Sequence, residues 1–103
     1  VLAHATLYNS SANTWTTAAS LHIARAGHTA TLLLDGRVLV TGGCSDIAIL
    51  NSVELYDPLT NSWSFGHNMT IPRVYHTATR MSNGDVLLIG GQKTGSTAAN
   101  SME

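Results

Sequence analysis

Residues 36–43 read GRVLVTGG, and residues 84–91 read GDVLLIGG, 48 positions further along the chain. Each stretch is a short apolar run that follows an Asp-Gly or Asn-Gly pair and ends at Gly-Gly. Asp-Gly and Asn-Gly accept the positive φ values of the type I′ turn that joins two strands of a hairpin. A near-continuous apolar run is expected of a strand that is covered on both faces. The two stretches therefore predict two similar hairpins, each buried between neighbours.

The same shift of 48 residues aligns much of the chain with itself. It places Trp15 on Trp63 and the segment 25–31 on the segment 73–79. One further match has a spacing of 49: it places Asn51-Ser52-Val53-Glu54 on Asn100-Ser101-Met102-Glu103. Self-similarity at a fixed period of roughly 20 to 50 residues is typical of repeat architectures. The first full repeat predicts four short strands, at His28–Leu34, Val38–Val40, Ser52–Tyr56 and Trp63–Phe65.

The order Arg-x-x-His, apolar run, Gly-Gly, Tyr and then Trp seven residues later resembles the kelch repeat. The residues that carry the resemblance are Arg25, His28, Gly42, Gly43, Tyr56 and Trp63, and in the second copy Arg73, His76, Gly90 and Gly91. The resemblance implies an all-β fold, a β-propeller fragment of four-stranded antiparallel kelch blades amounting to about two blade equivalents. Residues 1–20 would be the second half of one blade, 21–68 a complete blade, and 69–103 the first half of the next. All three would belong to one partial propeller domain.

Composition narrows the classes of function. The chain has 103 residues, of which 44% are hydrophobic and 11% charged, against roughly 25% charged in ordinary domains. The net charge of −1 offers no electrostatic footprint for nucleic acid or an anionic membrane. A single cysteine excludes an internal disulfide framework. The glycosylation sequons at Asn9 and Asn68 favour an extracellular location only slightly over a cytoplasmic one.

The residues that could suggest chemistry have structural interpretations. The Arg and His pairs and the two tryptophans recur at the repeat period, which favours packing between blades over a metal site or a sugar-stacking platform. Three other histidines, His4, His22 and His67, have neither repeat partners nor the spacing of metal ligands. Cys44 follows Gly-Gly, has no basic residue beside it in the sequence, and is interpreted as incidental. We expect no catalytic residue, cofactor or metal.

One enzymatic alternative arises from a second resemblance. The segment from Ile71 to Gly91 is also similar to the propeller of galactose oxidase-like copper radical enzymes, in which a tyrosine at the place of Tyr75 ligates copper and cross-links to a cysteine. The matching neighbourhood for that cysteine, 25–28, contains none, and Cys44 lies on the wrong side of the hairpin. We therefore expect Tyr75 to be a half-buried strand residue, and we regard a copper-dependent oxidase as the lesser alternative.

The preferred function is a protein-binding scaffold, with a carbohydrate-binding propeller as a further alternative. Propellers carry their functional residues on loops held by a rigid scaffold. The loops that differ most between the two copies supply the candidate partner-binding residues Ser45, Asp46, Ile47, Gln92, Lys93 and Thr94. The expected partners are proteins, with no nucleic acid and no membrane. Further kelch blades, in the same chain or by self-association, are also expected, because the two half-blades are complementary and would expose unpaired strand edges.

Overall fold

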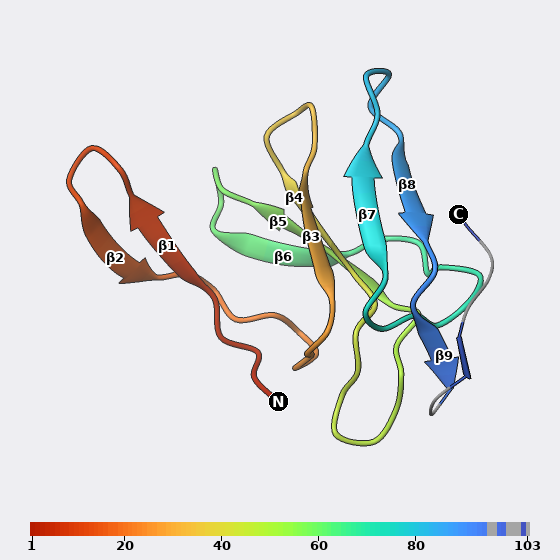
Figure 1. Ribbon diagram of the computed structural model, residues 1–103. Helices are drawn as coiled ribbons and strands as arrows, with labels where there is room; N and C mark the ends of the chain where they lie inside the picture. Colours follow the sequence, from red (N-terminus) through yellow and green to blue (C-terminus); the bar gives the residue numbers. More distant parts are fainter. Residues whose placement is uncertain (95–96, 99–101, 103) are drawn as a thin grey trace.

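The computed structural model describes residues 1–94, 97–98 and 102, and in these the chain forms strands, turns and loops (Figure 1). None of these residues forms a helix that could span a membrane. The strands are β1 Thr6–Asn9, β2 Thr14–Thr17, β3 Thr29–Leu32, β4 Val38–Thr41, β5 Val53–Asp57, β6 Ser62–Phe65, β7 Thr77–Arg80, β8 Val86–Ile89, β9 Gln92–Thr94 and β10 Thr97–Ala98. The all-β expectation is confirmed.

Strands β3 to β6 form the one four-stranded sheet of the described residues, in the order β3-β4-β5-β6. Every neighbouring pair is antiparallel, with Thr31 opposite Leu39 and Leu39 opposite Leu55. The connections follow from local turn chemistry: Gly36 at φ 91° turns β3 into β4, and Asn61 at φ 49° lies in the turn between β5 and β6. Glycine and asparagine are the residues that adopt positive φ at the lowest cost. The sheet is a single blade of the kind that the resemblance implied.

Two half-blades lie on opposite sides of this sheet (Figure 1). The hairpin β1–β2 precedes the sheet in sequence, and the ribbon β7–β8 follows it with β7 alongside β3. The small hydrophobic core lies where β7–β8 packs against the sheet. Its members are Val53, Met69 and Leu88, with Leu39, Ala78 and Val86 packed around them.

Residues 92–94 contradict the predicted loop, whereas Met102 agrees with the predicted start of a third strand. Residues 92–94 were expected in a loop, but they form β9, which pairs with β10. The Gln92 backbone also exchanges hydrogen bonds with Val74, at 2.8 Å and 2.9 Å, which fixes the start of this hairpin against the linker before β7. Met102 forms an antiparallel bridge with Ile89, which repeats the pairing of Val53 with Thr41. The predicted start of the next third strand, Ser101, lies outside the described residues.

Candidate functional site

A buried ion pair anchors residues 18–28, the linker between β2 and the four-stranded sheet. The Arg25 guanidinium donates to Glu54 Oε2 at 2.9 Å and to the carbonyls of Gly42 at 2.8 Å and Ser52 at 3.1 Å. Both side chains of the pair are fully buried. The Glu54 carboxylate also accepts the backbone N–H groups of His22 and Ile23, at 2.8 Å and 3.1 Å. Since the charges are paired and hydrogen-bonded, the linker is held against the start of β5.

The sequence analysis overlooked Glu54 in this role. A signal was present, because both members of the pair recur: Arg25 is matched by Arg73, and Glu54 is matched by Glu103 at the spacing of 49. Glu103 lies outside the described residues.

The second kelch histidine joins two blades. His76 is 5% exposed, and its Nε2 lies 3.0 Å from Thr29 Oγ1 and 2.8 Å from Thr41 Oγ1, both on the preceding blade. Burial lowers the pKa of His76 from its ordinary value, and the charge of Arg73 and then His28 lower it further. A neutral ring is therefore held between two hydroxyl groups. The structure places this side chain in the contact between the two blades, bonded to Thr29 and Thr41.

The glycine pair allows the next linker to approach the blade. A Cβ on Gly42 would lie 2.4 Å from the carbonyl oxygen of Arg73, and one on Gly43 would lie 2.6 Å from that of Ala26. The Gly43 N–H donates to the Arg73 carbonyl at 2.8 Å. No side chain fits between these backbones, so Gly42-Gly43 marks the place where the linker of the next blade meets this one.

Each tyrosine and tryptophan of the motif forms the same ring pair. The ring centroids are 5.0 Å apart in both Tyr56–Trp63 and Tyr8–Trp15, with interplanar angles of 49° and 50°. Trp63 also donates from Nε1 to the Ala19 carbonyl at 2.7 Å, whereas Trp15 is 69% exposed. The expected packing between blades is thus visible for Trp63 and is not visible for Trp15.

The expectation for Tyr75 is wrong. Tyr75 lies before β7, is 69% exposed, and adopts φ 59°. Its N–H donates to the carbonyl of Gly27 at 2.9 Å. Gly27 is the repeat counterpart of Tyr75 and has φ 66°, so the repeat requires a left-handed residue at this position whatever its side chain. Gly27 at the same position of the first copy was the sequence feature that could have predicted the left-handed backbone of Tyr75.

The candidate partner-binding residues gather at one end of the blades. Loop 42–52 turns sharply because Ser45 N–H donates to the Ala48 carbonyl at 2.8 Å, while the N–H groups of Ile47 and Ala48 donate to Ser45 Oγ. Ile47 at the tip is 94% exposed. Asp46 beside it lies 3.2 Å from the amino group of Val1. The turn therefore presents an aliphatic side chain outward.

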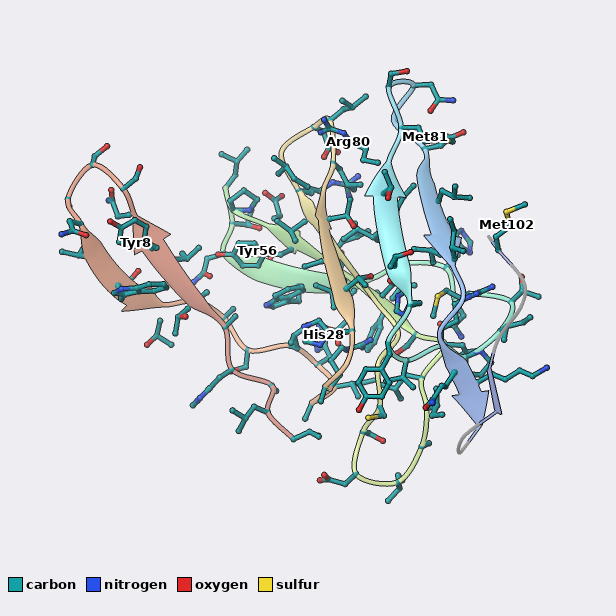
Figure 2. The ribbon with its side chains drawn as sticks, viewed as in Figure 1. Tyr8, His28, Tyr56, Arg80, Met81 and Met102 are labelled. Atoms are coloured by element: carbon teal, nitrogen blue, oxygen red, sulfur yellow. The ribbon has the colours of Figure 1, made fainter. Side chains whose placement is uncertain are left out.

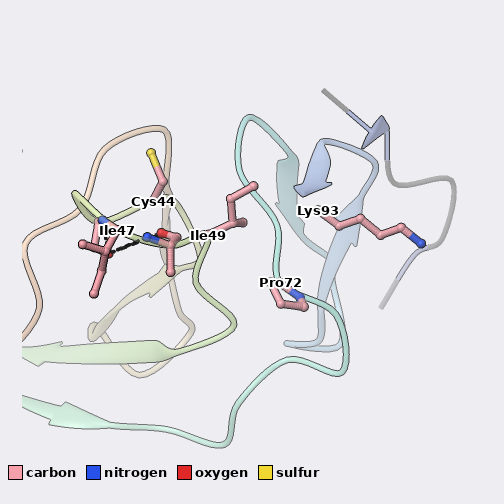
Figure 3. A pocket seen from close by; sticks show the side chains of 7 residues that line it. Cys44, Ile47, Ile49, Pro72 and Lys93 are labelled. Carbon is pink, nitrogen blue, oxygen red and sulfur yellow. Dashed lines mark hydrogen bonds between the residues drawn. The ribbon is translucent and has the colours of Figure 1, made fainter. Parts of the chain in front are cut away.

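Beside this turn is a pocket of about 560 Å³ (Figure 3). Its lining comes from two successive blades: Cys44, Ser45, Ile47, Ala48, Ile49, Pro72 and Lys93. Three predicted site residues, Ser45, Ile47 and Lys93, thus meet at one pocket. Gln92 instead pairs its backbone with Val74, and Thr94 lies in β9.

The remaining lining residues were missed by the sequence analysis. Pro72 belongs to the linker between blades, and only folding brings it to the loop of the preceding blade. Cys44, interpreted as incidental, lines the pocket, while its backbone is paired with Ala26 and Ile49. Lys93 is the single charged side chain among the lining residues that the structure describes, and no described carboxylate forms an ion pair with it. The pocket is mainly apolar, and the Lys93 ammonium group is its charged lining group among the described residues.

Comparisons with known proteins agree with this architecture. The family model described as Kelch motif matches residues 24–70, which include the linker with Arg25, the whole four-stranded sheet and the following linker up to Thr70. No curated protein matches the chain. The motif residues form the ion pair, the glycine contact and the ring pair of one four-stranded blade, and the same residue types recur in the half-blades beside it. Residues 24–70 therefore form a kelch repeat, and the segments on either side repeat parts of its motif.

Proposed function

We propose that this chain is a protein-interaction module, without catalytic activity of its own, that contacts its partner through the pocket at the loop end of its blades. The observation that carries the proposal is the pocket itself, an apolar concavity of about 560 Å³ between two successive blades. Its described lining includes neither histidine nor carboxylate. The side chains that general acid–base chemistry most often uses are therefore missing from this part of the lining.

The chemistry of the lining suggests what the partner presents. Burying one aliphatic or aromatic side chain contributes roughly 1.5–3 kcal/mol, which suits the apolar lining around Ile49 and Pro72. Lys93 at the edge favours a carboxylate next to that side chain. An exposed ion pair of this kind adds up to about 1 kcal/mol, so it would contribute more to the choice of partner than to affinity. The proposed partner is a protein segment with an apolar anchor beside an acidic residue.

Carbohydrate binding is the second candidate, and exposed Trp15 is the observation that favours it. Against it stands Trp63, which has the same ring geometry with Tyr56 as Trp15 has with Tyr8, and which packs against the linker at Ala19. The repeat supports a packing role for Trp15 as well. Protein binding at the loop end is therefore the preferred function.

Selection from a random peptide display library tests the proposal. We expect the recovered peptides to share an apolar residue beside Asp or Glu, and Ile47→Asp to abolish their binding. Leu59→Asp is the matched control, because Leu59 is also 94% exposed but lies in the turn that follows β5, at the opposite end of that strand from the loop that carries Ile47. Lys93→Glu should weaken the acidic peptides several-fold. Binding that survives Ile47→Asp as well as it survives Leu59→Asp would exclude this pocket as the site.

A further inference from the structure

The loop pocket has one wall from each of two successive blades. Ile47 and Ile49 lie in the loop between β4 and β5 of the intact blade. Pro72 lies in the linker 66–76, which leads from β6 to β7, and Lys93 lies in β9. The width of the pocket therefore depends on how this linker sits against the intact blade.

The end of the linker, residues 73–76, connects the two parts of the second wall. Pro72 directly precedes this segment. Within it, Val74 exchanges backbone hydrogen bonds with Gln92, at 2.8 Å and 2.9 Å, and Gln92 is the neighbour of Lys93. A displacement of residues 73–76 would therefore shift Pro72 and Lys93 together, relative to the loop on the other side of the pocket.

The side chain of His76 fastens this segment to the intact blade. Its Nε2 lies 3.0 Å from Thr29 Oγ1 and 2.8 Å from Thr41 Oγ1, and the two hydroxyl oxygens are 2.8 Å apart. Its Nδ1 is buried and has no hydrogen-bond partner among the described residues. We assign the proton of the neutral ring to Nε2, which can donate it to a hydroxyl. A second proton would have to bind at Nδ1, as a buried N–H without an acceptor.

The charges around the ring also oppose a second proton. After burial, which has the largest effect, the positive charges of Arg73 and His28 lower the pKa of His76. Arg73 lies on the same linker, and His28 lies at the start of β3 (Figure 2). Arg25 and Glu54 of the intact blade neutralise each other in their ion pair. The closed contact therefore accepts only the neutral ring, and a charged ring gains hydration by leaving its site.

We propose that His76 is a pH-sensitive switch between the two blades: when its ring takes up a second proton, the bonds to Thr29 and Thr41 break, residues 73–76 move, and partner binding at the loop pocket weakens. The effect on the pocket rests on the proposed function, whereas the opening of the contact does not. The open ring has the ordinary pKa of histidine, near 6.5. Each pH unit below that value raises the ratio of open to closed contact by up to about tenfold.

Amide hydrogen exchange of the full chain, without a partner, tests the opening. The Gly43 N–H donates to the Arg73 carbonyl and the Tyr75 N–H to the Gly27 carbonyl, so both amides report on the contact. Their protection factors should fall up to about tenfold from about pH 7.5 to about pH 5.5. The control is the amide of Gly66, which bonds within the sheet and should change less. Unchanged protection at the contact, or an equal fall at all three amides, overturns the proposal.

Two histidine substitutions assign the opening to one ring. His76→Gln does not titrate and should remove the pH dependence at Gly43 and Tyr75; if the dependence persists, the proposal is wrong. His22→Gln is the matched control, because the His22 ring is bonded to the Trp63 carbonyl in β6, and it should leave the dependence unchanged. Should His76→Gln fail to fold, NMR titration of the natural chain decides, since a His76 midpoint at or above about 6.5 contradicts the switch.

A peptide selected at about pH 7.5 tests the effect on the pocket. Its carboxylate stays charged down to about pH 5.5, so its affinity should fall several-fold for the natural chain and not for His76→Gln. Coupling between two sites is reciprocal, and bound peptide should therefore lower the NMR midpoint of His76. Peptide that binds equally at both pH values excludes control of the pocket by His76. If no peptide binds at either pH, the proposed function fails, and hydrogen exchange still decides whether the contact opens.

Discussion

The two sides of the intact blade carry the same motif in different states. On the side of β7–β8, His76 is 5% exposed and is bonded to two threonines, and a small apolar core fills the contact. On the side of β1–β2, His28 borders an open groove and Trp15 is exposed. The residue types are identical, so their burial depends on which neighbour is present. In a repeat protein, each unit contacts only its neighbours, and the interfaces between units supply much of the stability.

The largest expected loss of stability comes from the Arg25–Glu54 ion pair inside the intact blade, against which both half-blades pack. Glu54→Ala would leave the Arg25 charge buried without a partner and should lower the free energy of unfolding by about 3–5 kcal/mol. Urea denaturation at fixed protein concentration measures it. Asp35→Asn removes the exposed pair with Arg37 and should leave the midpoint unchanged. Equal midpoints for the two variants would mean that the buried pair does not anchor the linker.

Replacing each tryptophan compares how much packing stabilises the two sides of the blade. Trp63→Ala removes a half-buried ring and its bond to Ala19, and it should cost about 2 kcal/mol. Trp15→Ala removes an exposed ring and should cost less than about 1 kcal/mol in a single chain. Thermal and urea unfolding check both values. Equal costs at low protein concentration would show that the two sides are equally packed.

The two histidines predict a dependence on pH. The pKa of His76 is lowered in the folded chain, chiefly by burial, and that of His28 is lowered by burial and then by Arg25. Above the ordinary value near 6.5, both states are neutral and stability is constant. As pH falls below that value the unfolded chain takes up protons first, so stability decreases and then levels off below the folded pKa.

Single substitutions show which histidine causes this dependence of stability on pH. His76→Gln and His28→Gln should each flatten the profile of urea midpoint against pH measured from about pH 8 to about pH 5. His76 is the more buried of the two, so His76→Gln should flatten it more. A profile that neither substitution alters would assign the dependence to other groups.

The smallest expected effect is a gain in stability on replacing Tyr75, which lies just before β7. Tyr75→Gly relieves a left-handed backbone that Gly27 adopts without strain in the preceding copy. It should raise the free energy of unfolding by roughly 0.5–1 kcal/mol, less whatever the ring contributes by covering Gly27. Gly27→Ala is the converse variant and should destabilise, because its Cβ would lie 2.5 Å from Val74. Destabilisation by Tyr75→Gly would mean that the ring contact outweighs the backbone strain.

Particular residues show how far the sequence could predict the fold and the site. The Asp-Gly and Asn-Gly turns and the 48-residue period led to the β3–β4 and β7–β8 hairpins, because turn conformation and strand alternation are local properties. The same local reasoning was wrong for Tyr75, whose left-handed backbone is imposed by the position it occupies between two blades. It also assigned Gln92 to a loop, although Gln92 belongs to β9, which pairs with β10, and its backbone bonds to Val74.

The sequence by itself determined the repeat, the four-stranded blade and the loop that carries Ser45 and Ile47, because turn residues, apolar runs and the repeat period are local properties of the chain. Only the tertiary structure decided that Pro72 closes the loop pocket, that Glu54 holds Arg25, and that His76 is bonded while His28 faces a groove. These contacts join residues that are far apart in the sequence. Their geometry depends on how one blade packs against the next, which residue types alone do not specify.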